Sequence, residues 1–226
     1  MNLFVDAWHF LTTAGNWSGP TGIGKRILEH LWYSLLTVLL SAAIALPIGL
    51  PIGHTRRGSA LIVGFANAMR ALPTLGVLTF VVLGLGLGLI PPILALITVG
   101  IPPLLAGAYA GIANVDPTVV DASRAMGMKE WQILLRVEVP NALPVLLTGL
   151  RAATLQVVAT ATIAAYTNLG GLGRYIFDGI SLYRYDQVLV GAILVAALAL
   201  ALDTMLAFAV WLSVPGTGRL QLARSR

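Results

Sequence analysis

The chain has 226 residues, of which 58% are hydrophobic and 10% charged, and its mean hydropathy is +0.87. These values lie outside the range of soluble globular proteins and indicate a membrane protein with about five or six spans and no separate soluble domain. The absence of cysteine excludes disulfides, thiolate metal sites and thiol nucleophiles. The net charge of +5 is spread over short loops, which indicates membrane topology rather than nucleic-acid binding.

Residues 1–26 are predicted to form an amphipathic leader on the extracytoplasmic side. Phe4, Trp8 and Leu11 recur at helical spacing, which predicts a short helix in the headgroup layer; a partly disordered leader is the alternative. Asp6 interrupts the apolar run that a signal peptide needs, so we expect the leader to be retained.

The stretch SGPTGIGKRI, residues 18–27, differs at one position from the phosphate-binding pattern G-x-x-x-x-G-K-[ST], because Arg26 stands where that pattern has a hydroxyl residue. No strand pattern precedes it, and it falls on the outer side of the membrane, away from cytoplasmic ATP. We therefore predict that the chain binds no nucleotide and that this stretch is a turn into the first membrane helix.

The sequence predicts an all-α polytopic fold of five membrane spans, the second of which is broken. The predicted spans cover residues 27–53, 59–90, 91–112, 141–166 and 187–212. Pro73 interrupts the second span, because its missing N–H bends or breaks a helix. Residues 27–213 thus form one transmembrane domain, and a basic cytoplasmic tail follows at 214–226.

Basic residues predict the orientation, with the N-terminus outside and the C-terminus in the cytoplasm. This topology places more of them on the cytoplasmic side, whereas the reversed topology would place most of them outside. The cytoplasmic set is Arg56, Arg57, Arg124, Lys129, Arg136, Arg219, Arg224 and Arg226. The outer set is Lys25, Arg26, Arg174 and Arg184.

Residues 114–140 form a polar cytoplasmic segment whose charges do not belong in lipid. The pattern predicts an amphipathic helix over residues 117–126, which Gly127 ends by adopting a positive φ. A second helix is predicted to begin at Lys129 and to stop before Pro140. Such a hairpin between two spans is suited to docking a partner, and a surface linker is the alternative.

This segment resembles the EAA loop of bacterial ATP-binding-cassette (ABC) importer permeases, whose pattern is E-A-A, three residues, G, about nine residues and an apolar–x–x–P ending. The positions that match or adjoin the pattern are Asp121, Ala122, Ser123, Arg124, Gly127 and Pro140. Asp for Glu and Ser for the second Ala depart from it conservatively in charge and size. In that family the loop forms a coupling helix that sits in a cleft of the cytoplasmic ATPase subunit.

The resemblance implies a type I importer in the bacterial plasma (inner) membrane, in which ATP binding swings two permeases from inward- to outward-facing. The implied partners are two cytoplasmic ATPases, a second permease copy or paralogue, and an extracytoplasmic solute-binding protein. The chain itself is then no enzyme: it has no catalytic residue, metal or cofactor, and the partner ATPase binds ATP and Mg²⁺. The three histidines show no metal-ligand spacing.

Within the importers, residues 159–180 (ATATIAAYTNLGGLGRYIFDGI) and 188–203 (VLVGAILVAALALALD) are similar to permeases for the osmoprotectants glycine betaine, carnitine, choline and proline betaine. Permeases for methionine or other amino acids share the five-span layout and resemble RALP and DASRAMG, and they are the alternative.

A tight external loop is expected just before the last span. Its residues are Gly170, Gly171, Gly173 and Arg174. The glycines permit sharp backbone turns, and we expect the solute-binding protein to dock there. A plain turn into the following short helix is the alternative.

Three of the charges inside predicted spans are considered together, because ionisable groups there are costly and face protein or water. Arg70, Arg151 and Asp203 fall at similar depths when counted from the cytoplasmic ends of their spans. We predict that Asp203 pairs with Arg151 or Arg70 beside the inner part of the translocation path, to which Pro73 and Tyr166 are also assigned. Separate solvation of each charge is the alternative.

Tyr166, Tyr175, Tyr183 and Tyr185 cluster near the predicted outer mouth. Recognition of a quaternary ammonium relies on aromatic faces. An interfacial aromatic belt predicts the same residues and is favoured.

Two pairs of glycines have the small–xxx–small spacing that allows close helix approach. Gly49 with Gly53 and Gly84 with Gly88 are expected at a dimer interface or inside a single bundle.

A standalone channel and an intramembrane enzyme are the alternatives from other classes. The enzyme is disfavoured because paired membrane carboxylates, a His/Cys metal set and a nucleophile beside a base are absent from the sequence. A channel leaves the cytoplasmic hairpin unexplained.

Overall fold

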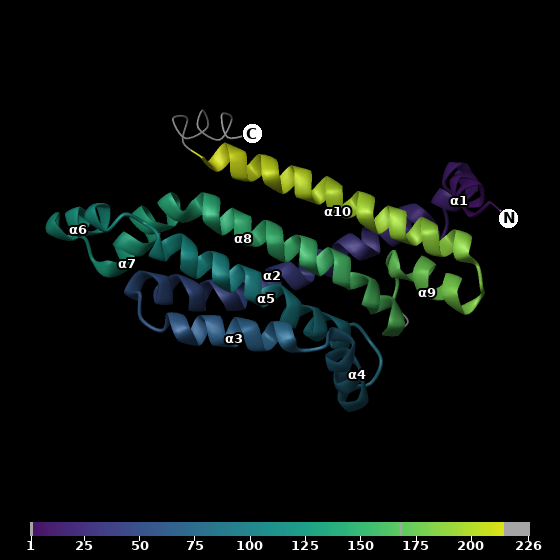
Figure 1. The fold of residues 1–226 in the computed structure, drawn as a ribbon, viewed down its shortest axis with the longest axis horizontal. Helices are drawn as coiled ribbons and strands as arrows, with labels where there is room; N and C mark the ends of the chain where they lie inside the picture. Colours follow the sequence, from purple (N-terminus) through teal and green to yellow (C-terminus); the bar gives the residue numbers. More distant parts are fainter. Residues whose placement is uncertain (1, 168, 215–226) are drawn as a thin grey trace. The chain divides into compact units, whose positions relative to one another are not determined.

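The computed structural model describes residues 2–167 and 169–214, and all regular structure in this part of the chain is helical (Figure 1). The helices are α1 Leu3–Thr12, α2 Ile23–Thr55, α3 Ser59–Ala71, α4 Thr74–Leu85, α5 Ile90–Ala113, α6 Pro117–Ala125, α7 Glu130–Ile133, α8 Val139–Thr160, α9 Gly173–Ser181 and α10 Tyr185–Ser213. The predicted all-α fold is confirmed. Apart from Val214, the predicted basic tail lies outside the described residues.

Four helical stretches are long and apolar enough to cross a membrane: α2, α5, the stretch Glu130–Thr167 that contains α8, and α10. A fifth crossing is broken into α3 and α4, which are bent by 79° at the break. Pro73 directly precedes α4, and its missing N–H disfavours the continuation of α3. The predicted break is confirmed, and the count reaches five when this pair is taken as one broken span.

The chain divides into two compact units, and each unit takes one part of every long membrane helix. Within the described residues, unit 1 holds residues 2–40, 72–100 and 154–202, and unit 2 holds residues 41–71, 101–153 and 203–214. The predicted hairpin and the predicted ion pair both fall in unit 2, whereas the leader and the external loop fall in unit 1.

Glycines let the helices of unit 2 approach closely. A Cβ added to Gly49 would lie 2.7 Å from the Cβ of Ala108, and Gly53 is similarly tight against α5. Gly107 of α5 and Gly149 of α8 meet backbone to backbone, because a Cβ on Gly107 would lie 2.8 Å from the Cα of Gly149. Membrane helices associate largely through such close packing. The pair Gly49 and Gly53 therefore packs inside the bundle.

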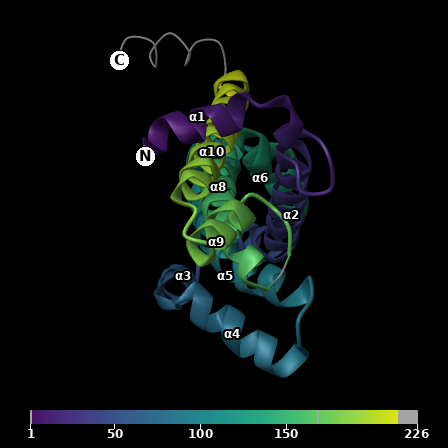
Figure 2. The ribbon, with the colours of Figure 1, turned by 90° about the vertical axis from the view of Figure 1, so that its right-hand side faces the viewer.

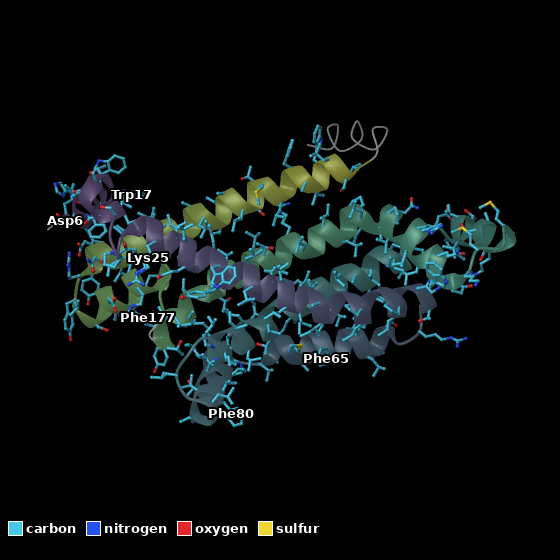
Figure 3. All side chains as sticks on the ribbon, turned by 180° about the vertical axis from the view of Figure 1, so that it is seen from behind. Asp6, Trp17, Lys25, Phe65, Phe80 and Phe177 are labelled. Atoms are coloured by element: carbon cyan, nitrogen blue, oxygen red, sulfur yellow. The ribbon has the colours of Figure 1, made fainter. Side chains whose placement is uncertain are left out.

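In unit 1, α1 folds against α9. The rings of Phe10 and Tyr175 meet edge to face, with centroids 5.9 Å apart, and the Tyr175 hydroxyl donates to the carbonyl of Thr21 at 3.0 Å. The labelled side chains Asp6, Trp17, Lys25 and Phe177 gather at the same end of the unit (Figure 3).

Helix α1 carries its large apolar side chains on the outside, where Phe4 and Trp8 are exposed. The predicted leader helix is confirmed, and the partly disordered alternative is wrong for residues 3–12. After it, Gly19 turns the chain with a φ of +90° and α2 begins at Ile23. The near-match to a phosphate-binding loop is therefore a turn into a membrane helix, as predicted.

Helix α4 lies at the margin of unit 1 (Figures 1 and 2), where Leu78 is buried and much of the rest of its surface is exposed. Phe80, which points away from the ribbon in Figure 3, is 78% exposed. Gly84 and Gly88 do not form a helical pair, because α4 ends at Leu85 and Gly88 lies beyond it with a φ of +155°. In a membrane such an apolar helix needs lipid or another protein against it.

Candidate functional site

Helix α6 begins at a cap formed by Asp116. The carboxylate of Asp116 accepts hydrogen bonds from the backbone N–H and the hydroxyl of Thr118, both at 2.8 Å. This cap satisfies a donor that the first turn leaves free, and Pro117 in that turn needs no partner. The bonds from Thr118 stabilise the ionised form and hold the pKa of Asp116 below its ordinary value. The first helix of the predicted hairpin is confirmed.

Gly127 makes the turn between α6 and α7. Its φ is +81°, in the left-handed region that side chains disfavour, and its N–H donates to the carbonyl of Arg124 at 2.9 Å. An added Cβ would meet nothing within 4 Å, so the backbone conformation alone explains glycine here. The predicted helix–glycine–helix arrangement is confirmed.

The second helix of the hairpin runs on through Pro140, so the prediction that it stops before this residue is wrong. From Glu130 the chain forms α7, a π-helical turn over Leu134–Glu138, and then α8 without interruption. In the π turn the N–H of Val139 donates to the carbonyl of Leu134, five residues back. This wider turn relieves the clash between a proline ring and the carbonyl four residues earlier, which normally ends a helix.

An apolar cluster fixes the hairpin to the ends of two membrane helices. Val120 of α6 and Ile133 of α7 are buried with Ile112, Val115 and Ala142. The hairpin, defined here as residues 116–138, is therefore a packed structure and not a loose linker.

Other apolar side chains of the hairpin face outward. They are Val119, Met126, Trp131 and Leu135, of which Met126 is 75% exposed. The Arg136 guanidinium lies 6.0 Å from the centroid of the Trp131 ring. Exposed apolar side chains of this kind are typical of surfaces that contact another protein or a membrane.

The residues predicted for ATPase coupling divide between the two sides of α6. Asp121, Ala122 and Arg124 are exposed. Ser123 is buried, and its hydroxyl donates to the carbonyl of Val119 at 2.8 Å. Because the hydroxyl has this partner inside α6, serine fits at a buried position where the EAA pattern has alanine.

A charge network closes the hairpin. Arg124 donates from Nη1 to Asp121 at 2.9 Å and from Nε to Glu130 at 2.8 Å, so it joins α6 to α7. His54, at the end of α2, contacts both Glu130 and Glu138. The sequence reasoning missed His54, and no local signal in the sequence identifies it, because 84 residues separate it from Glu138.

An ion pair joins two membrane helices in unit 2. Arg151 of α8 meets Asp203 of α10 at two points, Nε to Oδ1 at 2.5 Å and Nη2 to Oδ2 at 2.7 Å. The predicted pairing of Asp203 with Arg151 is confirmed. Arg70, at the end of α3, is exposed and makes no ion pair with another described residue, so the alternative pairing with Arg70 is wrong.

The predicted external loop is tightly packed in unit 1. The N–H of Gly171, whose φ is +89°, donates to the carboxylate of Glu29 at 2.8 Å, and Arg26 donates to the same oxygen at 2.9 Å. Cβ atoms on Gly170 and Gly173 would clash with neighbouring atoms. Arg174 pairs with an acidic residue one turn on in α9. The role of this loop in docking stays a prediction.

The predicted tyrosine cluster is partly structural. Tyr175 is bound to the leader through its hydroxyl, and burial raises its pKa. Tyr166 meets Phe177 edge to face, and Tyr183 and Tyr185 are exposed. Both the interfacial belt and a path role for Tyr166 stay predictions.

A polar stripe follows the buried face of α2 in unit 1. His30, Ser34 and Thr37 are buried, and His30 Nε2 lies 2.9 Å from the carbonyl of Val158. The other ring nitrogen of His30 and the hydroxyls of Ser34 and Thr37 have no partner in the described part of the chain. Buried polar atoms without a protein partner typically bind an ordered water, or gain a partner in another conformation of the protein. Among the described residues no group of three or more His, Cys, Asp or Glu is placed to hold a metal ion.

This architecture matches solved importers. The protein superposes on one chain of the MetNI methionine ABC transporter, whose crystals hold an inward-facing conformation, with a TM-score of 0.75 and 21% identity. The superposition covers 85% of this protein and 96% of the MetNI chain. A second crystal form of the same transporter gives a TM-score of 0.70. The fold and the hairpin define the transmembrane domain of a type I ABC importer.

A family model described as "binding-protein-dependent transport system inner membrane component" matches residues 45–210, and the chain belongs to this family of multi-pass membrane permeases. It is 37% identical over 175 residues to the carnitine transport permease protein OpuCB of Listeria monocytogenes, covering 77% of this chain and 80% of that relative. It is 36% identical over 179 residues to the glycine betaine/carnitine/choline permease OpuCB of Bacillus subtilis, covering 79% and 82%.

Proposed function

We propose that this chain is the permease subunit of an ATP-driven importer for quaternary-ammonium osmoprotectants such as glycine betaine, carnitine, choline and proline betaine. The observation that carries this proposal is the 35–37% identity to three permeases named for these solutes, each over more than three quarters of both chains. The likeness to the methionine transporter is a likeness of fold at 21% identity. Amino-acid import is therefore the second candidate, and a standalone channel leaves the hairpin without a role.

The hairpin is the proposed binding site for a cytoplasmic ATPase. Its outward apolar side chains and the exposed charges of Asp121 and Arg124 supply a surface for a cleft in a partner, and the buried cluster beneath them transmits a push to α5 and α8. Two ATPases, which bind ATP and Mg²⁺, would thereby drive two permease copies, or this chain and a paralogue, by alternating access. The orientation with the N-terminus outside follows from the same assignment.

The ion pair of Arg151 and Asp203 is the proposed charged element of the translocation path. Arg151 lies 12 residues after Val139 and Asp203 lies 10 residues before Ser213, which corresponds to about 18 and 15 Å of helix, close to half of a hydrocarbon core. Both side chains remain partly exposed, and lipid solvates such charges poorly. Water or a facing permease is therefore expected on this side. Pro73 and Tyr166 are kept as further path residues.

The loop of Gly170, Gly171, Gly173 and Arg174 is the proposed contact for an extracytoplasmic solute-binding protein. The proposal is supported by the order of this loop, because the hydrogen bond from the Gly171 N–H to Glu29 holds it in place without a partner. A loop that is already ordered loses less entropy when it binds.

Reconstitution into proteoliposomes with the importer's ATPase and binding protein tests the proposal. ATP-dependent uptake of labelled glycine betaine is measured with choline or methionine as separate competitors. We expect uptake that choline blocks and methionine does not. Transport of methionine, with betaine and choline ignored, would refute the osmoprotectant assignment while the importer assignment stood. Failure of the ATPase to co-purify with the permease would refute the importer assignment itself.

A further inference from the structure

We propose that His54 is a positioning residue that ties the coupling hairpin to the first membrane span. The proposal rests on the proposed function, because it concerns how a movement that the ATPase imposes on the hairpin is passed on inside this chain. His54 lies in the last turn of α2, and its side chain is only 11% exposed.

Both ring nitrogens of His54 meet a carboxylate of the hairpin. Nδ1 lies 2.5 Å from Oε2 of Glu138, and Nε2 lies 2.9 Å from Oε2 of Glu130. The imidazole is therefore held at both of its polar edges, one against α7 and one against the π turn. Two such contacts fix the position and the orientation of the ring relative to the hairpin.

Burial of Glu138 makes this contact hard to give up. Its side chain is 4% exposed, and a buried carboxyl group that loses its partner is left without water or another hydrogen-bond partner. His54 is the ion-pair partner of Glu138 among the described residues. The end of α2 therefore cannot separate from the π turn unless Glu138 also leaves its buried position.

Glu130 extends the connection into α6. Its carboxylate accepts from Arg124 at 2.8 and 3.1 Å, and Arg124 also donates to Asp121. The network of polar contacts runs through Asp121, Arg124, Glu130, His54 and Glu138. A displacement of α6 is thereby carried through the ion pairs of Glu130 to α2.

Other described contacts between the end of the first span and this region have a different character. Arg56 donates to the carbonyl of Val115 at 3.1 Å, which precedes the hairpin. Leu50 packs against the apolar cluster, a non-directional contact that permits sliding. Within residues 2–167 and 169–214, the polar contacts from α2 to α7 and the π turn are those of His54.

The first test measures betaine uptake and ATP hydrolysis in the same proteoliposomes, and the variants are His54→Ala, His54→Arg and Glu130→Gln. Coupling energies between sites typically correspond to factors of about 5–150. We therefore expect the uptake per ATP hydrolysed to fall by about fivefold or more in His54→Ala and Glu130→Gln. Arginine donates to two carboxylates at once, so His54→Arg should restore much of the ratio. The control is His9→Ala, which removes an exposed histidine of α1.

If the role of the histidine is purely structural, its loss lowers uptake and hydrolysis together, and that outcome overturns the proposal. A wild-type ratio of uptake to ATP hydrolysis in both His54→Ala and Glu130→Gln also overturns it. If His54→Ala fails to assemble, Glu130→Gln decides, because Glu130 is 58% exposed and its loss leaves the buried contact with Glu138 in place.

A second readout does not depend on the solute. The chain lacks cysteine, so Thr55→Cys, next to His54 and exposed, can be labelled selectively with a polar maleimide. In a complex with a hydrolysis-deficient ATPase, we expect ATP to change the labelling rate when His54 is present and not in the His54→Ala background. An equal response in both backgrounds overturns the proposal, whereas failure of the ATPase to bind the wild-type chain refutes the proposed function.

Discussion

Arg151 and Asp203, 52 residues apart in the sequence, face each other across two membrane helices with paired contacts of 2.5 and 2.7 Å. The planar guanidinium matches the carboxylate at two points, a geometry that lysine cannot reproduce. Removing either partner leaves the other charge without its counter-charge inside a membrane span, where lipid solvates ionised groups poorly.

Asp203→Asn should therefore reduce transport severalfold by leaving Arg151 without its counter-charge. The exchange of the two residues, Arg151→Asp with Asp203→Arg, should recover part of the loss because the pair is restored in reverse. Uptake into proteoliposomes measures both effects, and Asp186→Asn, at the start of α10, controls for the loss of a carboxylate. Wild-type uptake and folding in Asp203→Asn would eliminate the role.

The crossing of α5 and α8 gives a stability prediction. Gly107→Ala places a Cβ against the backbone of Gly149, which cannot move aside as a side chain does, so overpacking should cost about 1–3 kcal/mol of unfolding free energy. Gly64→Ala, in α3, adds a Cβ that meets nothing within 4 Å and should be neutral or stabilising. Thermal unfolding in detergent compares the two variants. Equal stability of the two would contradict the close approach.

The unpaired hydroxyl of Thr37 predicts a substitution that stabilises. Thr37→Val keeps the shape and removes a fully buried hydroxyl that has no partner, so it should raise the unfolding free energy by up to about 1–3 kcal/mol. Thr98→Val is the matched control, because Thr98 donates to the carbonyl of Ala95 at 2.7 Å and its loss should destabilise. Destabilisation by both would mean that water satisfies Thr37 in the folded protein.

Local signals in the sequence predicted much of this fold. A proline without an N–H broke a span at Pro73, and a glycine at a helix end gave the turn at Gly127. The positions of Arg151 and Asp203 along their spans predicted that the two side chains lie at similar depths. Because few partners for a charge exist inside a membrane span, the pair could be predicted.

The errors arose where tertiary structure overrode a local rule. Pro140 was expected to end a helix, but a π turn just before it widens the helix enough to pass. The contact of His54 with Glu130 and Glu138 depends on how the end of α2 packs beside the hairpin. Nothing in the residues around position 54 encodes that packing, so residue spacing could not reveal it.

The turn between α6 and α7 allows the proposed docking function to be tested without removing a charged or apolar contact. Gly127→Ala forces an ordinary residue to a φ of +81°, at a cost of about 1–2 kcal/mol, whereas Gly127→Asn keeps a residue that visits this region readily. Because no atom lies within 4 Å of the added Cβ, both variants differ from the wild type in backbone preference and not in crowding. We expect ATPase co-purification to weaken in the order wild type, Gly127→Asn, Gly127→Ala. Equal recovery of the ATPase with all three would mean that the shape of this turn does not govern docking.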